Sequence, residues 1–118
     1  MVNKSVVYER AYQFAIRVVK LNQYLRKEHQ EYVMSKQLLR CGTSVGANIA
    51  EANGAISPAD FSAKISIAYK EILETKYWLS LLKETGFIHQ SAYASIFQDA
   101  DEIAKILFAI LRKTRINC

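Results

Sequence analysis

Hydrophobic residues recur every three or four positions in four separate segments of the chain, a spacing that places side chains on one face of an α-helix. The first segment predicts a helix from about Ser5 to Lys27. Its hydrophobic seam consists of Val7, Ala11, Phe14, Val18, Leu21 and Leu25. The second segment predicts a helix from Ser35, a candidate N-cap, to about Asn53. Its seam consists of Leu38, Val45, Ile49 and Ala52.

The third and fourth segments have clear boundary signals. Ser57 is an N-cap candidate followed by Pro58 and by Asp60 at the third helical position, and Gly86 marks the end of this helix. Its seam consists of Phe61, Ile65, Ala68, Ile72, Leu79 and Leu82. The fourth helix is predicted from about Ser91, with a seam that consists of Tyr93, Ile96, Ala100, Ile103, Leu107 and Ile110. The basic residues that suit its C-terminus are Arg112, Lys113 and Arg115.

Four long amphipathic helices with short connections predict an all-α fold, namely an antiparallel up-and-down four-helix bundle. The chain shows no strand alternation and no internal repeat. At 118 residues it is long enough for a single core, so we expect residues 1–118 to form a single four-helix-bundle domain.

Three of the predicted helices carry more hydrophobic residues than one bundle core needs. The first, third and fourth helices extend their apolar surface beyond the ~100° stripe that faces a core. On the third helix, Ile67, Trp78 and Leu81 lie off the seam. Because monomers rarely expose large apolar patches, this surplus predicts a homo-oligomer.

Charge is unevenly distributed along the chain. The formal net charge is +5, and residues 1–59 hold eight basic against four acidic residues, while residues 60–118 hold eight against seven. An anion-binding surface is therefore expected on the first two helices. The two cysteines, Cys41 and Cys118, form no C-x-x-C motif or disulfide framework. With no export signal and no apolar run long enough to span a bilayer, the expected location is the cytoplasm, away from the membrane.

Glycine is concentrated between residues 40 and 54, where three of the four glycines lie. Gly42 and Gly46 are four residues apart and therefore share one side of a helix. In a helix interior each costs about 1 kcal/mol relative to alanine, so close packing is the natural compensation. A polar line runs beside them and consists of Arg40, Ser44, Asn48 and Glu51.

The residues alone leave three interpretations of this polar line open. Catalysis would require a base beside Ser44, and neither His29 nor His89 is near it in the sequence. Pairing with a neighbouring helix or subunit would satisfy the polar groups. Contact with a ligand or nucleic acid is the third interpretation, because small residues allow close approach. We favour the structural interpretation and expect no catalytic residue.

Three glutamates, Glu51, Glu71 and Glu74, raise the question of a metal site. Di-metal sites in bundles use Glu-x-x-His pairs, and the chain has none. We therefore expect no metal, no cofactor and no enzymatic activity.

A basic stripe that includes one tyrosine runs along the first predicted helix and continues into the second. Lysine and arginine neutralise phosphates, and tyrosine stacks on bases. The same stripe is also typical of a solvated helix face. The candidate nucleic-acid contacts are Arg10, Arg17, Lys20, Tyr24, Lys27, Lys36 and Arg40.

Two stretches resemble a known family. They are L-L-R-C-G-T-S-V-G-A-N-I-A-E-A and S-P-A-D-F-x-x-K-x-x-I-A-x-K-E-x-x-E-T-K-Y-W-L-x-L-L, which together cover about half of the chain. They resemble the bacterial four-helix-bundle family named for 23S rRNA intervening-sequence proteins. The family-motif residues that we treat as candidate interface positions are Arg40, Ser44, Gly46, Asn48, Glu51, Lys64, Glu71, Glu74 and Trp78.

The resemblance implies a cytoplasmic, non-enzymatic bundle, commonly assembled as a ring of five. It also implies a distant kinship with accessory variability proteins of retroelements, which look like pentameric barrels that engage RNA. The leading hypothesis is a homo-oligomer, most simply a pentamer, that binds RNA or a nucleoprotein through basic residues of the first two helices. The alternative is a protein interaction scaffold without nucleic-acid affinity.

Overall fold

The computed structural model describes residues 2–116, with side chains described for residues 6–114; Cys118 and the side chain of Arg115 lie outside these ranges. The helices are α1 (Val2–His29), α2 (Met34–Asn53), α3 (Pro58–Glu84) and α4 (Gln90–Ile116). Within the described residues there is no strand, so the predicted all-α fold of four helices is confirmed. Helix α1 is longer at both ends than the seam predicted, and α4 begins one residue earlier.

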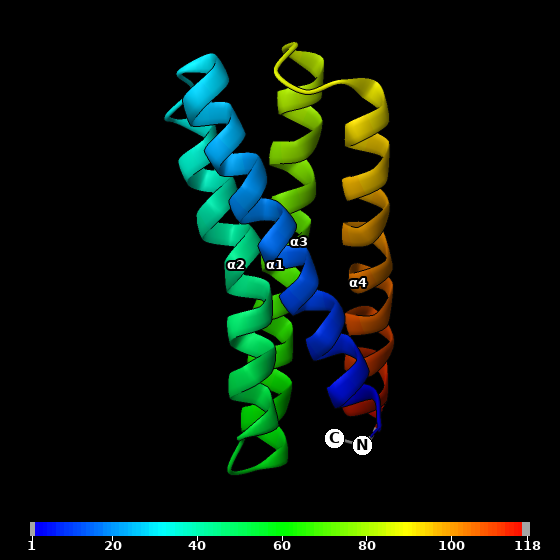
Figure 1. The fold of residues 1–118 in the computed structure, drawn as a ribbon. Helices are drawn as coiled ribbons and strands as arrows, with labels where there is room; N and C mark the ends of the chain where they lie inside the picture. Colours follow the sequence, from blue (N-terminus) through cyan, green and yellow to red (C-terminus); the bar gives the residue numbers. More distant parts are fainter. Residues whose placement is uncertain (1, 117–118) are drawn as a thin grey trace.

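Each helix packs on the next one in the chain, and α4 also meets α1. In Figure 1 the α1–α2 and α3–α4 connections lie at one end of the molecule, and the α2–α3 connection lies at the other end with the start of α1. Helix α1 runs obliquely, so its first turns lie near the end of α4 and its last turns near the start of α2 (Figure 1). The contact between α1 and α4 is consequently less extensive than the contact between α1 and α2.

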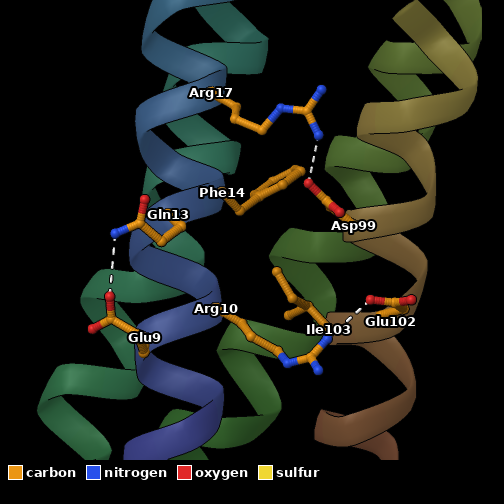
Figure 2. A pocket seen from close by; sticks show the side chains of 8 residues that line it. All are labelled: Glu9, Arg10, Gln13, Phe14, Arg17, Asp99, Glu102 and Ile103. Atoms are coloured by element: carbon orange, nitrogen blue, oxygen red, sulfur yellow. Dashed lines mark hydrogen bonds and ion pairs between the residues drawn. The ribbon is translucent and has the colours of Figure 1, made fainter. Parts of the chain in front are cut away.

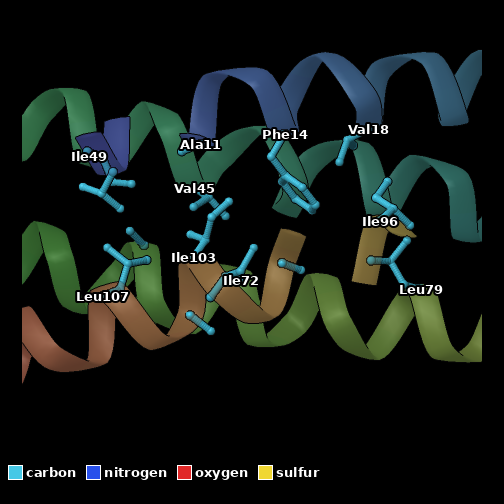
Figure 3. Packing of buried hydrophobic residues seen from close by; sticks show 14 of the residues in the cluster. Ala11, Phe14, Val18, Val45, Ile49, Ile72, Leu79, Ile96, Ile103 and Leu107 are labelled. Atoms are coloured by element: carbon cyan, nitrogen blue, oxygen red, sulfur yellow. The ribbon is translucent and has the colours of Figure 1, made fainter. Parts of the chain in front are cut away.

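The core contains the seams that the sequence predicted. Figure 3 shows side chains from all four helices meeting along the bundle axis, among them Phe14, Val45, Ile72 and Ile103. Four seam residues lie at the margin of the core and are only partly buried: Leu21, Phe61, Tyr93 and Ile110. Burial of the remaining apolar side chains, at roughly 1.5–3 kcal/mol each for the larger ones, is the main driving force for folding.

The start of α2 differs from the sequence prediction, because Ser35 is not the N-cap. Val33 occupies that position, and Ser35 is buried in the first turn, where its hydroxyl donates to the Glu31 carbonyl at 2.6 Å. The Glu31 carboxylate accepts from the backbone amides of Val33, Met34 and Ser35 at 3.3, 3.1 and 2.8 Å. A carboxylate from the preceding connection therefore satisfies the first amides of α2, which the apolar side chain of Val33 cannot cap.

Replacing Glu31 with alanine is expected to lower the free energy of unfolding by about 1–2 kcal/mol, the usual cost of a lost helix cap. The reason is that the first amides of α2 lose their shared acceptor. Glu28→Ala, an exposed glutamate three residues earlier, is the matched control and is expected to change stability little. Urea denaturation of both variants measures the difference, and equal midpoints would show that water caps α2 as well as Glu31 does.

Both predicted boundaries of α3 are confirmed. The Ser57 hydroxyl accepts from the Asp60 amide at 3.0 Å, and the Asp60 carboxylate accepts from the Ile56 amide at 3.2 Å. Pro58 begins the helix. Gly86 has a φ of 87°, the left-handed conformation that ends a helix at low cost when the residue is glycine.

One buried polar contact ties α1 to the start of α2. The Asn22 side-chain amide donates to the Ser35 carbonyl at 2.9 Å, and Asn22 is 5% exposed.

Among residues 2–116, no helix combines the length and the apolar character needed to cross a membrane.

Candidate interaction surfaces

The polar line of α2 lies along α3, and glutamates of α3 neutralise the charge of Arg40. The Arg40 guanidinium contacts the carboxylate of Glu71 at 3.4 Å and also pairs with that of Glu74. The Trp78 indole N–H donates to Glu74 Oε2 at 3.1 Å. These hydrogen bonds, first from Trp78 and then from Arg40, hold the pKa of the Glu74 carboxyl below its ordinary value. Arg40, Glu71, Glu74 and Trp78 therefore form one network that braces α2 against α3.

The remaining polar motif residues have partners on α3 or within α2. Lys64 pairs with Glu51 at 2.9 Å, and this contact raises the pKa of the Lys64 ammonium group. The Asn48 side-chain amide donates to the Ser44 carbonyl at 2.9 Å and to the Ser44 hydroxyl at 3.1 Å. Glu51 is therefore paired with a neighbouring helix, as the structural interpretation expects, whereas Asn48 is paired within α2.

The two motif glycines lie on the opposite side of α2, against α1. A Cβ atom at Gly42 would lie 2.8 and 2.9 Å from the two methyl groups of Val18. A Cβ atom at Gly46 would lie 3.6 Å from the Ala11 carbonyl oxygen and 3.7 Å from the Ala11 Cβ. The glycines thus allow close approach of α1 and α2, with Gly42 at the tighter point.

Trp78 is more buried than its position in the sequence indicated. The off-seam position indicated a side chain that the core does not need, whereas Trp78 is partly buried and packs against the core. Its indole N–H reaches Glu74 because residues four apart are neighbours on a helix. Ile67, also off the seam, is 41% exposed.

Three of the seven candidate nucleic-acid contacts form ion pairs within the protomer. Arg10 pairs with Glu102 at 2.9 Å, and Arg17 pairs with Asp99 at 2.5 Å and donates to the Ser95 hydroxyl at 3.1 Å. Figure 2 shows both arginines reaching from α1 across to α4. Arg40 is the third, through its contacts with α3. These arginines hold helices together and offer less free positive charge than the sequence indicated.

The other four candidates lie on the surface. Lys20, Lys27 and Lys36 are exposed. Tyr24 is 40% exposed, and its hydroxyl lies 3.1 Å from His29 Nε2. The three lysines are therefore the candidates most available to an anionic partner.

A cavity of about 210 Å³ lies between α1 and α4 (Figure 2). Phe14 and Ile103 form its floor, and the pairs Arg10–Glu102 and Arg17–Asp99 form its walls. The two ion pairs are each neutral, and the remaining charge of the lining is that of Glu9, whose carboxylate accepts from the Gln13 side-chain amide at 3.2 Å. Among the described residues, no group of histidine, cysteine and carboxylate side chains is arranged to hold a metal ion. Cys41 is buried, and burial raises the pKa of its thiol.

Helix α1 carries an exposed apolar strip on its outer face, which we name the α1 strip. Tyr12, Ile16 and Val19 are 51%, 37% and 36% exposed and follow one another at helical spacing. Tyr8 extends the strip, with its ring stacked on Tyr12 at a centroid distance of 6.1 Å. The sequence predicted apolar surface beyond the core stripe on this helix, and in the structure Tyr12, Ile16 and Val19 are part of that surface.

A second exposed apolar surface lies on α3 and α4, at positions outside the predicted core seams. Leu73 is 42% exposed, Tyr77 is 60% exposed and Phe108 is 45% exposed. The signal that would have indicated it is the off-seam series Tyr69, Leu73 and Tyr77, which recurs every four residues on α3.

Comparison with known proteins places the chain among helical bundles of one family. The family model described as 23S rRNA-intervening sequence protein matches residues 3–109. One solved crystal structure is of a protein of unknown function from the S23 ribosomal protein family, from Bacteroides thetaiotaomicron VPI-5482. Its sequence is 49% identical to that of this chain, and the two structures align with a TM-score of 0.91. That match covers 93% of this chain and 98% of the other. No curated protein matches the chain.

Proposed function

The chain belongs to the 23S rRNA-intervening sequence protein family, and from this premise we propose that it is a non-enzymatic homo-oligomer of antiparallel up-and-down bundles that binds RNA or a nucleoprotein. In this proposal the assembly is a pentamer, it works in the cytoplasm, and basic residues of α1 and α2 make the RNA contact. The α1 strip is the observation that carries the assembly: Tyr12, Ile16 and Val19 are exposed apolar side chains on one face of α1.

Burial of the α1 strip in a subunit contact supports self-association. Each apolar square ångström removed from water contributes about 25 cal/mol, and aromatic side chains supply much of the energy of subunit contacts. The strip combines two tyrosines with Ile16 and Val19 over three turns of one helix. Its burial against a second copy removes a surface that a soluble monomer would otherwise expose.

The RNA component of the proposal rests on charge and on family. Lys20, Lys27 and Lys36 are exposed, and the protein has a formal net charge of +5. The name of the family and that of the solved relative refer to rRNA and to a ribosomal protein family. Exposed lysines release counterions when they neutralise phosphates, which provides affinity that does not depend on RNA sequence.

A protein interaction scaffold without nucleic-acid affinity is the second candidate. It is favoured by the ion pairs of Arg10, Arg17 and Arg40, which place three of the predicted phosphate contacts against carboxylates of the same chain. A phosphate would have to compete with those carboxylates for the guanidinium groups.

Salt dependence distinguishes the two candidates. We expect the purified protein to bind a fluorescein-labelled single-stranded RNA, with an affinity that falls as salt rises. Each phosphate contact contributes about 0.7 to the slope of log affinity against log salt, so a variant with Lys20, Lys27 and Lys36 changed to alanine is expected to lose about two units of slope.

The matched control for this measurement is Lys83→Ala, because Lys83 is paired with Glu84 at 2.8 Å. It is expected to leave the slope nearly unchanged. Absence of RNA binding at low ionic strength would reject the RNA component and leave the scaffold as the better proposal.

A further inference from the structure

The outer surface between α3 and α4 contains a shallow groove that the interactions described so far do not use. Its cavity has a volume of about 310 Å³. The apolar part of its lining consists of Tyr69, Leu73, Ala104 and Phe108, and the charged part consists of Lys76, Asp101 and Lys105. We name it the α3–α4 groove. It is separate from the cavity between α1 and α4 and from the polar motif on α2.

Aromatic rings form one side of the α3–α4 groove. The rings of Tyr69 and Phe108 lie with their centroids 5.9 Å apart, and Phe108 is 45% exposed. Tyr77 lies beside the groove and not in its lining: it follows Leu73 by four residues on α3, is 60% exposed, and its ring meets that of Trp78 edge-on at a centroid distance of 5.0 Å. Two of these rings therefore present exposed surface on which a planar group can stack.

Positive charge dominates the other side. Asp101 lies between two lysines, at 2.8 Å from Lys76 Nζ and 3.2 Å from Lys105 Nζ, so these three residues carry a net charge of +1. Lys105 is 76% exposed. Arg112 is also exposed and follows Phe108 by four residues, which places it on the same side of α4.

The carboxylates that could balance this charge are engaged elsewhere. Glu71 and Glu74 contact Arg40, and Glu84 contacts Lys83. On α4, the carboxylates of Asp99 and Glu102 point to the arginines of α1. Of the described cations of α4, Lys105 and Arg112 are thus left on the groove side without these carboxylates.

We propose that the α3–α4 groove and the adjoining Tyr77 bind single-stranded RNA, with unpaired bases stacked on Tyr77 and Phe108 and phosphates on Lys105 and Arg112. This inference rests on the proposed RNA-binding function. It adds a class of substrate and a second contact surface, on α3 and α4, besides the lysines of α1 and α2. Exposed aromatic rings beside a cationic surface are the features by which proteins bind single strands without reading a sequence. Duplex RNA has its bases stacked and paired within the helix, so it can use only the cations.

Fluorescence anisotropy with the full-length protein tests the proposal. The probes are a fluorescein-labelled unstructured RNA oligonucleotide and the duplex formed with its complement. The wild-type protein is expected to bind the single strand more tightly than the duplex. Tyr77→Ala and Phe108→Ala are each expected to weaken single-strand binding about tenfold and to affect duplex binding much less.

Matched controls lie outside the groove. Tyr32→Ala removes a tyrosine that is 55% exposed in the α1–α2 connection. Lys113→Ala removes an exposed lysine of α4 and is the control for Lys105→Ala, which is expected to weaken binding of both probes. The controls are expected to bind the single strand as the wild type does, apart from the small loss that any removed cation causes. Circular dichroism verifies that Phe108→Ala, which removes part of the contact with Tyr69, keeps its helices.

The outcomes separate this inference from the function on which it rests. If the wild type binds neither probe at low salt, the proposed RNA-binding function fails. If it binds RNA but Tyr77→Ala and Phe108→Ala behave like Tyr32→Ala, the groove is not the site, while the function stands. Equal affinity for duplex and single strand also overturns the inference. A fall in the assembly mass of Tyr77→Ala would overturn it too, because a second copy would then cover the groove.

Discussion

Replacing Gly46 with leucine is expected to lower the free energy of unfolding by about 2 kcal/mol, because α1 leaves no room for a large side chain there. The space beyond a Cβ at residue 46 is occupied by the Ala11 carbonyl group at 3.6 Å and the Ala11 Cβ at 3.7 Å. Backbone atoms cannot move aside as the end of a flexible side chain can, so α1 and α2 would have to separate. Leucine regains about 0.8 kcal/mol of helix propensity, which offsets only part of the cost.

Two alanine variants determine whether helix separation causes the effect. Gly46→Ala is expected to keep or raise stability, by up to about 1 kcal/mol, since its Cβ makes only ordinary contacts with Ala11. Gly42→Ala is expected to be less stable than Gly46→Ala, because its Cβ would lie 2.8 Å from a methyl group of buried Val18. Urea denaturation and thermal melting of the three variants supply the comparison. An unchanged melting temperature for Gly46→Leu would contradict the close approach of the helices.

Changing Ile16 to glutamate is expected to convert the proposed assembly into smaller species. Ile16 lies in the middle of the α1 strip and is 37% exposed, so a monomer can hold a glutamate there in contact with water. In a subunit contact the same carboxylate would be buried without a partner, at a cost of several kcal/mol. Light scattering coupled to size-exclusion chromatography is expected to give a wild-type mass near five times 13.5 kDa and a variant mass near 13.5 kDa.

Gln13→Glu is the matched control for this experiment. Residue 13 is exposed on α1 outside the strip, so the same negative charge is expected to leave the mass unchanged. A wild-type protein that elutes as a folded monomer would contradict the proposed assembly. Dissociation of both variants would indicate a general effect of charge on α1 in place of a contact through the strip.

The helices and their ends were predictable where the signals are local. The seams identified the core face of each helix because burial follows a period of 3.6 residues, and Ser57 with Asp60 identified the start of α3 because a capping box is complete within four residues. The prediction that Ser35 is the N-cap of α2 was wrong, although it also rested on a local signal. A serine ahead of an apolar run is a common cap, but Glu31 lies within reach and takes all three amides.

The surfaces were less predictable, because they depend on which helices become neighbours. Periodicity indicated that apolar residues exceed the core, and it placed both Trp78 and Ile67 off the seam of α3. In the structure Trp78 packs against the core, whereas Ile67 is 41% exposed. The helical wheel of α3 cannot separate the two positions, since the position of α2 beside α3 decides which one is covered.

The sequence by itself determined the four helices, their core faces and the family, because each of these depends on residues close together in the chain. The tertiary structure alone decided what the charged residues do. Arg10 and Arg17 meet Glu102 and Asp99, which are 92 and 82 residues away, and Arg40 meets Glu74 across α2 and α3. The basic stripe predicted free positive charge, but its three arginines form ion pairs between helices. An ion pair requires only that its two residues are close in space, whatever their separation in the sequence.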